Sequence, residues 1–350
     1  MGEPMSTDAD RFRLISEIES IRDARVLSLV LGDRRGHETK IAGDVLPLAY
    51  EHLRAFGHTR EIALFLYTTG GDTVAGWGLV NLLREYCDKL AVIAPFRCLS
   101  TGTLIALGAD EIVLAAGAQL GPIDPSVSSP YNPPAPGPPQ PGRVSLLPVS
   151  VEDLVGFVHF VKDEGGVRAE EPMARILASL ADKVHPLALG AVHRAREQVN
   201  ELAKKLLRSH MDDDARAEEI ANWLGRLPSH NYIISRREAR TVLGDDLVRP
   251  IPEELEPHVW SLYRAYDVWL ELTAPYSADV ELGDQESVTK TFPRAALESR
   301  KEDGLKTHVF RTTKELRRVQ MTQPGLAAPV AAIQERTIAE GWTAWPEESH

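Results

Sequence analysis

Three short apolar runs, separated by segments of helical periodicity, constrain the fold most strongly. The runs are Ile62–Tyr67, Leu90–Pro95 and Ile112–Ala116. Short runs that are apolar throughout are typical of strands buried on both faces of a parallel sheet. Apolar residues recur at helical spacing over Val74–Tyr86, and a short helical segment, Leu104–Leu107, precedes the third run. The order β-α-β-α-β predicts an α/β fold with a parallel sheet and right-handed crossovers.

Outside this region the chain changes character several times. Arg25–Leu31 is expected to be a strand and Ile41–Phe56 a helix, whereas the prolines of Ser126–Leu147 exclude regular helix and central strand. In the tail, Thr307–Thr312 and Leu316–Met321 are expected to pair as a hairpin, and Gln323–Pro329 is expected to be a loose end. We therefore expect five parts: a flexible N-terminus (1–20), a core (21–125), a proline-rich loop or flap (126–149), a helical part of the core domain (150–272) and a C-terminal extension (273–350).

Composition limits the class of protein. The formal charge of −12 over 350 residues argues against a nucleic-acid backbone as the main partner. The two cysteines, Cys87 and Cys98, do not form a disulfide framework and are expected to be reduced thiols. There is no apolar run of about 18 residues and no recognisable signal peptide. We expect a cytoplasmic protein without a membrane span.

Two motifs follow the first two apolar runs, and together they indicate acyl-transfer chemistry. Gly70 and Gly71 end the first run, and Ser100 follows the second. A serine nucleophile needs a base and hydrogen-bond donors that stabilise the oxyanion, which the amides of Gly71 and Thr101 can supply. On its local sequence alone, Ser100 is more simply a helix cap. The glycines alone also fit a tight turn or a phosphate-binding turn, although Asp72 is unfavourable to phosphate.

Three motifs together resemble the serine dehydrogenase proteinase family, which is related to signal peptide peptidase A within the Clp protease/crotonase fold. They are Tyr67–Asp72, Leu99–Val113 and Leu120–Pro125. Two later segments, Lys183–Gly190 and Ser229–Ala239, resemble soluble members of the same family. The resemblance implies a Clp/crotonase-type core, Ser100 as nucleophile, an oxyanion hole near Gly71 and Thr101, and a groove in which a peptide lies as an added strand. It also implies a homo-oligomer.

The general base is less well defined. Related proteases use a lysine near the start of the helix beyond the flap, but this chain has no lysine between Lys89 and Lys162. Lys162 is the first candidate, and its alternative is a solvated lysine near a helix C-terminus. Lys183 and His185 follow, although His185 fits a capping or turn-anchoring role. The histidine of Clp-like members would fall near Asp124.

One further histidine, His230, lies in a family-like segment and is alternatively a residue that hydrogen-bonds within the core. The sequence has no recognisable metal-ligand motif, so neither a metal nor a cofactor is expected. The favoured function is a serine peptidase acting on a peptide or protein. The alternatives are a crotonase-type acyl-CoA enzyme and an inactive binding or scaffold protein.

Overall fold

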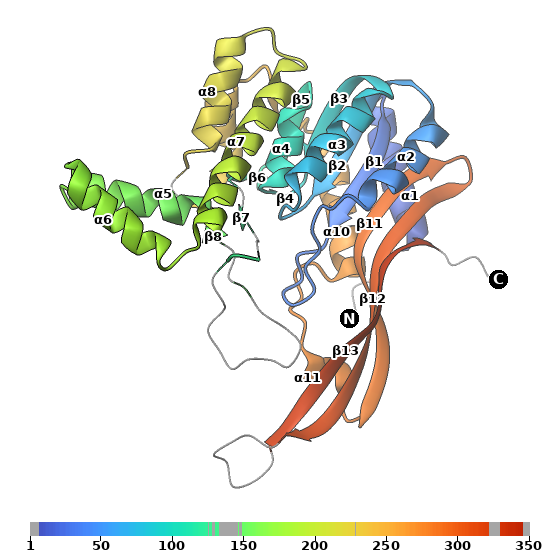
Figure 1. Cartoon of the computed structure of the whole chain (residues 1–350). Coiled ribbons are helices and arrows are strands. Elements are labelled where there is room, and N and C mark those ends of the chain that lie inside the picture. The colour runs from blue at the N-terminus through green and yellow to red at the C-terminus, as the bar shows by residue number, and fades with distance from the viewer. Residues whose placement is uncertain are drawn as a thin grey trace. The chain divides into compact units, whose positions relative to one another are not determined.

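The computed structural model describes residues 7–124, 126–127, 130–132, 146, 149–227, 229–321 and 330–345. The chain divides into two compact units (Figure 1). The first consists of Met1–Gln119 and Ser235–His350, and the second of Leu120–Ile234. This division differs from the five expected parts. The C-terminal extension completes the sheet of the first unit, and most of the expected helical part belongs to the second.

The first unit contains an eight-stranded sheet of order β10-β5-β3-β2-β1-β11-β12-β13. The first five of these strands pair in parallel, and their bounds are β1 (Arg25–Leu31), β2 (Thr59–Tyr67), β3 (Cys87–Ala94), β5 (Glu111–Leu114) and β10 (Val248–Pro250). The three apolar runs correspond to β2, β3 and β5, and every residue of Ile62–Tyr67 is fully buried. The predicted α/β fold with parallel β-α-β units is confirmed.

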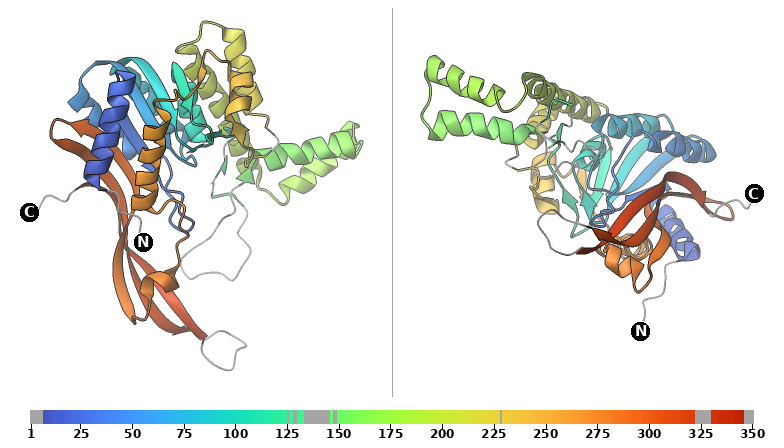
Figure 2. Two further views of the ribbon diagram at one scale, coloured as in Figure 1. Left: turned by 180° about the vertical axis from the view of Figure 1, so that it is seen from behind. Right: turned by 60° about the horizontal axis from the view of Figure 1, so that its bottom comes forward.

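Helices cover both faces of this sheet (Figure 2). One face packs against α1 (Asp8–Arg22) and α10 (Glu256–Leu270), through core residues such as Ile15, Phe65 and Leu262. The other face carries α2 (Val45–Phe56), α3 (Thr73–Arg84) and α4 (Thr101–Leu107). Two further helices complete the unit, α9 (Arg236–Leu243) and α11 (Ala278–Leu282).

Helix α1 corrects the expected flexible N-terminus. Thr7 and Asp10 form a capping box at its start. The side chain of Arg11 is fully buried, where it pairs with Glu298 at 3.0 Å and lies over the ring of Trp269 at 3.8 Å. Because charged side chains are usually exposed to solvent, the arginine at position 11 does not indicate a buried helix face, and the sequence pattern does not predict this helix.

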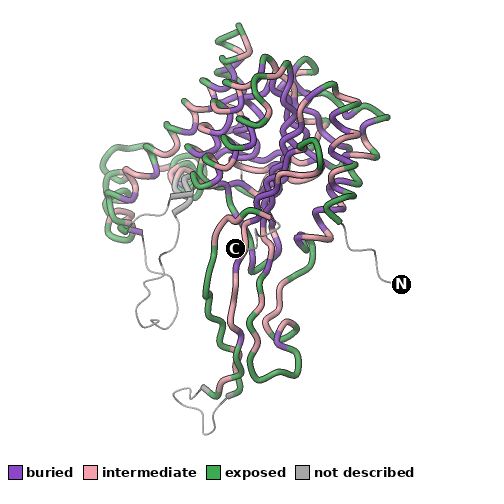
Figure 3. The backbone as a smooth tube through the Cα atoms, turned by 90° about the vertical axis from the view of Figure 1, so that its right-hand side faces the viewer, coloured by how far each residue is buried: buried purple, intermediate pink, exposed green. Residues whose placement is uncertain are grey.

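The C-terminal strands are β11 (Ser287–Lys301), β12 (Gly304–Met321) and β13 (Val330–Trp345). They form an antiparallel arm whose distal part is mostly exposed (Figure 3). The predicted hairpin is wrong, because Thr307–Thr312 and Leu316–Met321 both belong to β12 and pair instead with β11 and β13. The polar residues between them continue the strand through cross-strand hydrogen bonds, such as the 3.0 Å bond from Lys314 to Glu335. Gln323–Pro329 lies outside the described residues.

The second unit is mainly helical. Its elements are β7 (Ser126–Val127), β8 (Val149–Ser150), α5 (Val151–His159), the π-helix η1 (Phe160–Glu164), α6 (Glu170–Ala181), α7 (Pro186–Arg208) and α8 (Asp214–Leu224). Helices α7 and α8 pack through small and aliphatic side chains, including Val199, Ala203 and Ile220, all of which are buried. Most of the proline-rich stretch lies outside the described residues. The short strands β6 (Gln119–Leu120) and β9 (Ile234–Ser235) lie where the chain passes between the units.

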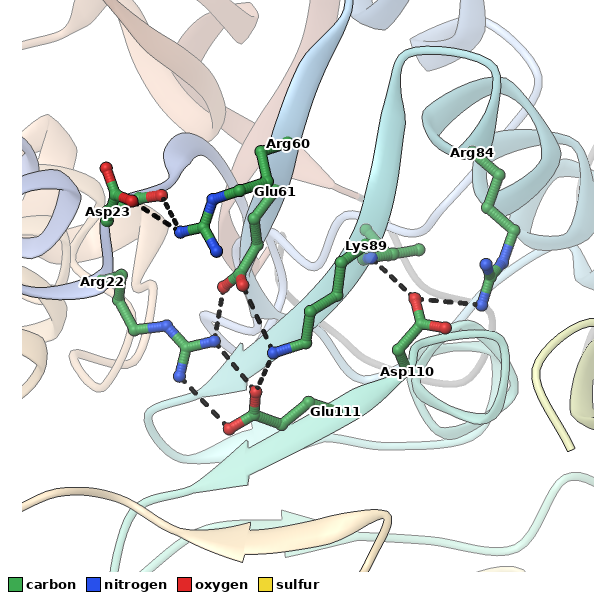
Figure 4. A network of polar contacts seen from close by, with 9 residues as sticks. Arg22, Asp23, Arg60, Glu61, Arg84, Lys89, Asp110 and Glu111 are labelled. Carbon is green, nitrogen blue, oxygen red and sulfur yellow. Dashed lines mark hydrogen bonds and ion pairs between the residues drawn. The ribbon is translucent and has the colours of Figure 1, made fainter.

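A partly buried ion-pair network joins α1 to the amino ends of the parallel strands (Figure 4). Arg22 contacts Glu61 at 2.5 Å and Glu111 at 3.1 Å, and Lys89 contacts Glu111 at 2.6 Å. Burial alone would raise the pKa of Glu111, but the hydrogen bonds from Arg22 and Lys89 outweigh it and lower that pKa to about 2. The network therefore stabilises the amino ends of the parallel strands, whereas the two sequence motifs lie at their carboxyl ends.

Candidate active site

The two motifs meet at the carboxyl ends of β2 and β3. Thr68, directly after β2, forms a parallel bridge with Cys98 of β4 (Arg97–Cys98). The amide of Thr68 donates to the carbonyl of Arg97 at 2.9 Å, and the amide of Leu99 donates to the carbonyl of Thr68 at 3.0 Å. This pairing brings the Gly70–Gly71 turn alongside Ser100, as expected for neighbouring strands of a parallel sheet.

Ser100 has a backbone conformation that non-glycine residues rarely adopt. Its φ is 53° and its ψ is −115°, and its side chain makes no capping hydrogen bond to α4. The capping role considered for Ser100 is therefore not present in this structure. A serine held on a strained strand-to-helix turn is the arrangement that exposes a nucleophilic hydroxyl, and strain of this kind is concentrated at functional sites.

Gly70 and Gly71 are required by this geometry. Gly70 has a φ of +110°, and a Cβ there would lie 2.7 Å from Cβ and 3.0 Å from Oγ of Ser100. Gly71 has a φ of +153°, and a Cβ there would lie 2.2 Å from the carbonyl oxygen of Ile41. The Ile41 amide donates to the Gly70 carbonyl at 3.0 Å, which fixes the turn. Any larger side chain at either glycine would displace Ser100 or the Ile41 segment.

Two amides remain available beside Ser100. The Gly70 amide already donates to Thr68 Oγ1 at 2.9 Å. Among the described residues, the amides of Gly71 and Thr101 have no acceptor. The hydroxyl of Thr101 donates to the Gly71 carbonyl at 2.7 Å and so ties these two residues together. Gly71 is exposed and Ser100 is half-buried. A carbonyl group bound here could therefore meet both the Ser100 hydroxyl and the amides of Gly71 and Thr101.

Asp33 supports this turn, although its sequence context does not predict this role. The hydroxyl of Tyr67 donates to Asp33 at 2.9 Å, and Arg97 pairs with the other carboxylate oxygen. The Asp33 side chain is only 4% exposed, so one buried carboxylate joins the end of β2 to the start of β4. Burial and the charge of Asp33 raise the pKa of Tyr67, which keeps its hydroxyl protonated. The only sequence signal is an acidic residue just after the first strand.

Neither cysteine competes with Ser100 as a nucleophile. Both are buried and unpaired. Burial raises the pKa of the Cys98 thiol to about 12 and that of Cys87 to about 11. Because the thiolate is the reactive form, both thiols are inert at neutral pH. Asp72 likewise has a structural role, since its carboxylate caps α3 by accepting from Val74 N at 2.8 Å.

The candidate bases all belong to the second unit. Lys162 lies in η1 and is exposed, as is Lys183. His185 caps α7 by accepting from Leu187 N at 3.2 Å, which confirms its expected capping role. His230 places Nδ1 3.0 Å from each carboxylate oxygen of Asp124, which is 5% exposed. Ser100, Gly70, Gly71 and Thr101 are thus brought together within the first unit, whereas these four residues belong to the second.

Comparisons with known proteins agree with the motifs. Residues 46–137 match a family described as ClpP-like SDH-type serine proteinase. An uncharacterized protein of Methanocaldococcus jannaschii is 30% identical over 205 residues, which is 58% of this chain and 59% of that protein. A second uncharacterized protein of the same organism is 35% identical over 128 residues, covering 33% of this chain and 42% of that protein. The chain therefore spans about half the length of these curated relatives.

Two solved structures are similar at low sequence identity. A membrane-bound stomatin-specific protease is 14% identical, with 61% of this chain and 75% of that chain covered and a TM-score of 0.34. ClpP1 from Listeria monocytogenes is 14% identical, with 67% and 95% covered and a TM-score of 0.35. Across the described residues, no helix is both long and apolar enough to cross a membrane. The family match spans Gly70, Gly71 and Ser100 and confirms the predicted resemblance: residues 46–137 are similar to the ClpP-like SDH-type serine proteinases.

Proposed function

We propose that this protein is a serine peptidase in which Ser100 is the nucleophile. The observation that carries the proposal is the strained backbone of Ser100 packed against Gly70, beside two amides that have no acceptor among the described residues. Ser100 Oγ attacks the peptide carbonyl carbon as a base removes its proton. The developing oxyanion accepts hydrogen bonds from the amides of Gly71 and Thr101. The amine then leaves with a proton, and water hydrolyses the acyl-enzyme.

For the general base we place His230, oriented by Asp124, ahead of Lys162. A general base needs a proton-accepting nitrogen in a fixed orientation, and a carboxylate bonded to Nδ1 holds the imidazole with Nε2 as the accepting atom. Asp124 is bonded to Nδ1 in this way. A lysine base needs burial to lose its proton near neutral pH, whereas Lys162 is exposed. Lys162 remains the second candidate.

The base can be assigned by measuring kcat/KM on a fluorogenic peptide as a function of pH. A histidine base gives activity that rises with pH as the imidazole loses its proton, because only the neutral imidazole can accept the serine proton. His230→Gln should abolish activity and Asp124→Asn should lower it by orders of magnitude, while Lys162→Met should leave it unchanged. Lys205→Met is the matched control, since Lys205 is an exposed lysine of the second unit, on α7, and is not a candidate base. Loss of activity in Lys162→Met alone would assign the lysine instead.

An inactive scaffold is the alternative, and the exposure of Lys162 is the observation in its favour. In that case a folded protein would cleave no peptide, and Ser100→Ala would not alter binding to its partner. A crotonase-type enzyme would instead be stabilised by acyl-CoA esters in a thermal-shift assay. We also propose a peptide or protein substrate, a cytoplasmic location and a homo-oligomer. Light scattering on the purified protein tests the last of these.

A further inference from the structure

The second unit contains a cavity that shares only Asp124 with the residues of the peptidase proposal. Its volume is about 320 Å³, and it is lined by α7, by α8 with the two residues 225–226 after it, and by residues 123–124. Helices α7 and α8 lie side by side in Figure 1. Ligand cavities usually measure roughly 300–1,000 Å³, so this one is suited to a small molecule or a short peptide. The polar lining residues are Asp124, Arg196, Glu197, Asn200, Asn222 and Arg226.

Two arginines of this lining have no partner in the described part of the chain. Neither the Arg196 nor the Arg226 side chain forms an ion pair or hydrogen bond there, although the Arg226 backbone amide donates to the carbonyl of Trp223. Two arginines of helices α7 and α8 outside the cavity are paired: Arg208 contacts Asp214 at 2.6 Å, and Arg216 contacts Glu219 at 2.8 Å. Two unpaired guanidinium groups at one cavity favour an anion, and their planar donors match a carboxylate.

An amide oxygen beside them also lacks a partner. Asn200 Nδ2 donates to Asn222 Oδ1 at 3.1 Å. Asn200 Oδ1 is buried and accepts no hydrogen bond among the described residues. A buried acceptor without a donor costs about 1–3 kcal/mol. A ligand that brings an N–H group to this oxygen would recover that cost, which a simple anion such as acetate cannot do.

We propose that this cavity binds a short peptide by its free C-terminal carboxylate. The carboxylate lies between Arg196 and Arg226, and a peptide N–H donates to Asn200 Oδ1. Exposed Glu197 offers a partner for the peptide's amino group. Asp124 does not oppose the bound carboxylate strongly, because His230 is hydrogen-bonded to it. This inference rests on the cavity alone and does not depend on the peptidase proposal, although a peptidase would generate ligands of this class.

The test is calorimetric titration of full-length Ser100→Ala, which cannot turn over a peptide through Ser100, with trialanine. Trialanine amide, which lacks the carboxylate, should bind at least roughly tenfold more weakly. Arg196→Gln and Arg226→Gln should each weaken trialanine binding by a similar factor. Arg194→Gln is the matched control, because Arg194 lies on α7 outside the cavity and should leave the affinity unchanged.

Circular dichroism of each variant checks that α7 and α8 remain folded. Asn200→Ala should weaken the binding of trialanine more than the binding of acetate, because only the peptide carries an N–H donor. Equal affinity for trialanine and its amide would overturn the proposal, as would unchanged binding in the Arg196→Gln/Arg226→Gln double variant. Acetate binding as tightly as trialanine would also overturn it. None of these outcomes depends on whether the wild-type protein cleaves peptides.

Discussion

Replacing Ser100 with glycine should stabilise the protein relative to alanine at the same position. Both substitutions remove the hydroxyl, but only glycine adopts a φ of 53° with a ψ of −115° without strain. A non-glycine residue in a sparsely populated backbone region costs roughly 1–3 kcal/mol. Glycine loses about 0.5–1 kcal/mol more backbone entropy than alanine on folding. The free energy of unfolding of Ser100→Gly should therefore exceed that of Ser100→Ala by about 1 kcal/mol, in the middle of a range of roughly 0–2.5 kcal/mol.

Urea denaturation followed by tryptophan fluorescence measures this difference. The signal reports mainly on the first unit, which contains Ser100 and five of the six tryptophans, namely Trp77, Trp260, Trp269, Trp342 and Trp345. Ser16, inside α1, is the control, because there alanine should be more stable than glycine by about 1 kcal/mol. The glycine variant should thus be the more stable of the two at position 100, and the alanine variant the more stable at position 16. If alanine is at least as stable as glycine at position 100, the inference of a strained nucleophile turn is refuted.

Three further predictions concern the turn and the buried charges. Gly71→Ala should destabilise the protein by at least about 2 kcal/mol and abolish activity, because its Cβ would meet Ile41 at 2.2 Å, whereas Gly43→Ala, with no atom within 4 Å, should be neutral. Glu111→Gln should lower the free energy of unfolding at pH 7 by about 1–2 kcal/mol after allowance for solvent screening. The difference in unfolding free energy between this variant and the wild type should shrink as pH falls from about 4.5 towards 2, because the Glu111 pKa is lowered to about 2 in the folded protein. Burial, followed by the charges of neighbouring groups, lowers the pKa of His52 to about 3 in the folded protein. The unfolded chain therefore binds a proton at His52 at higher pH than the folded protein does, so the free energy of unfolding should fall as pH drops from about 6.5 towards 3. His52→Gln should make that decline shallower in urea titrations at successive pH values.

The sequence predicts the centre of the sheet well, because strands buried on both faces leave a simple apolar pattern. It predicts less where burial involves charged or polar groups. Helix α1 was missed because Arg11 is buried through its pairing with Glu298, a residue 287 positions away. Strand β12 was divided in two because its polar middle is stabilised by strands on either side. Such partners are set by tertiary contacts, which local periodicity does not contain.

Part of the candidate site can likewise be predicted from the sequence, and part of it cannot. Ser100, Gly70, Gly71 and Thr101 follow neighbouring strands, so their proximity can be predicted from the order of elements. The pairing of His230 with Asp124 joins residues 106 positions apart. No sequence spacing indicates that pair or the support from Asp33.

The most direct test of the account is intact-protein mass spectrometry after treatment with a fluorophosphonate, with Ser100→Ala beside the wild type. A fluorophosphonate modifies a serine only where the hydroxyl is activated and an oxyanion is stabilised. The account predicts a single adduct on the wild-type protein and none on Ser100→Ala, with peptide mapping placing the adduct on Ser100. A folded wild-type protein that remains unlabelled, or an equal adduct on Ser100→Ala, would contradict the assignment of Ser100 as nucleophile.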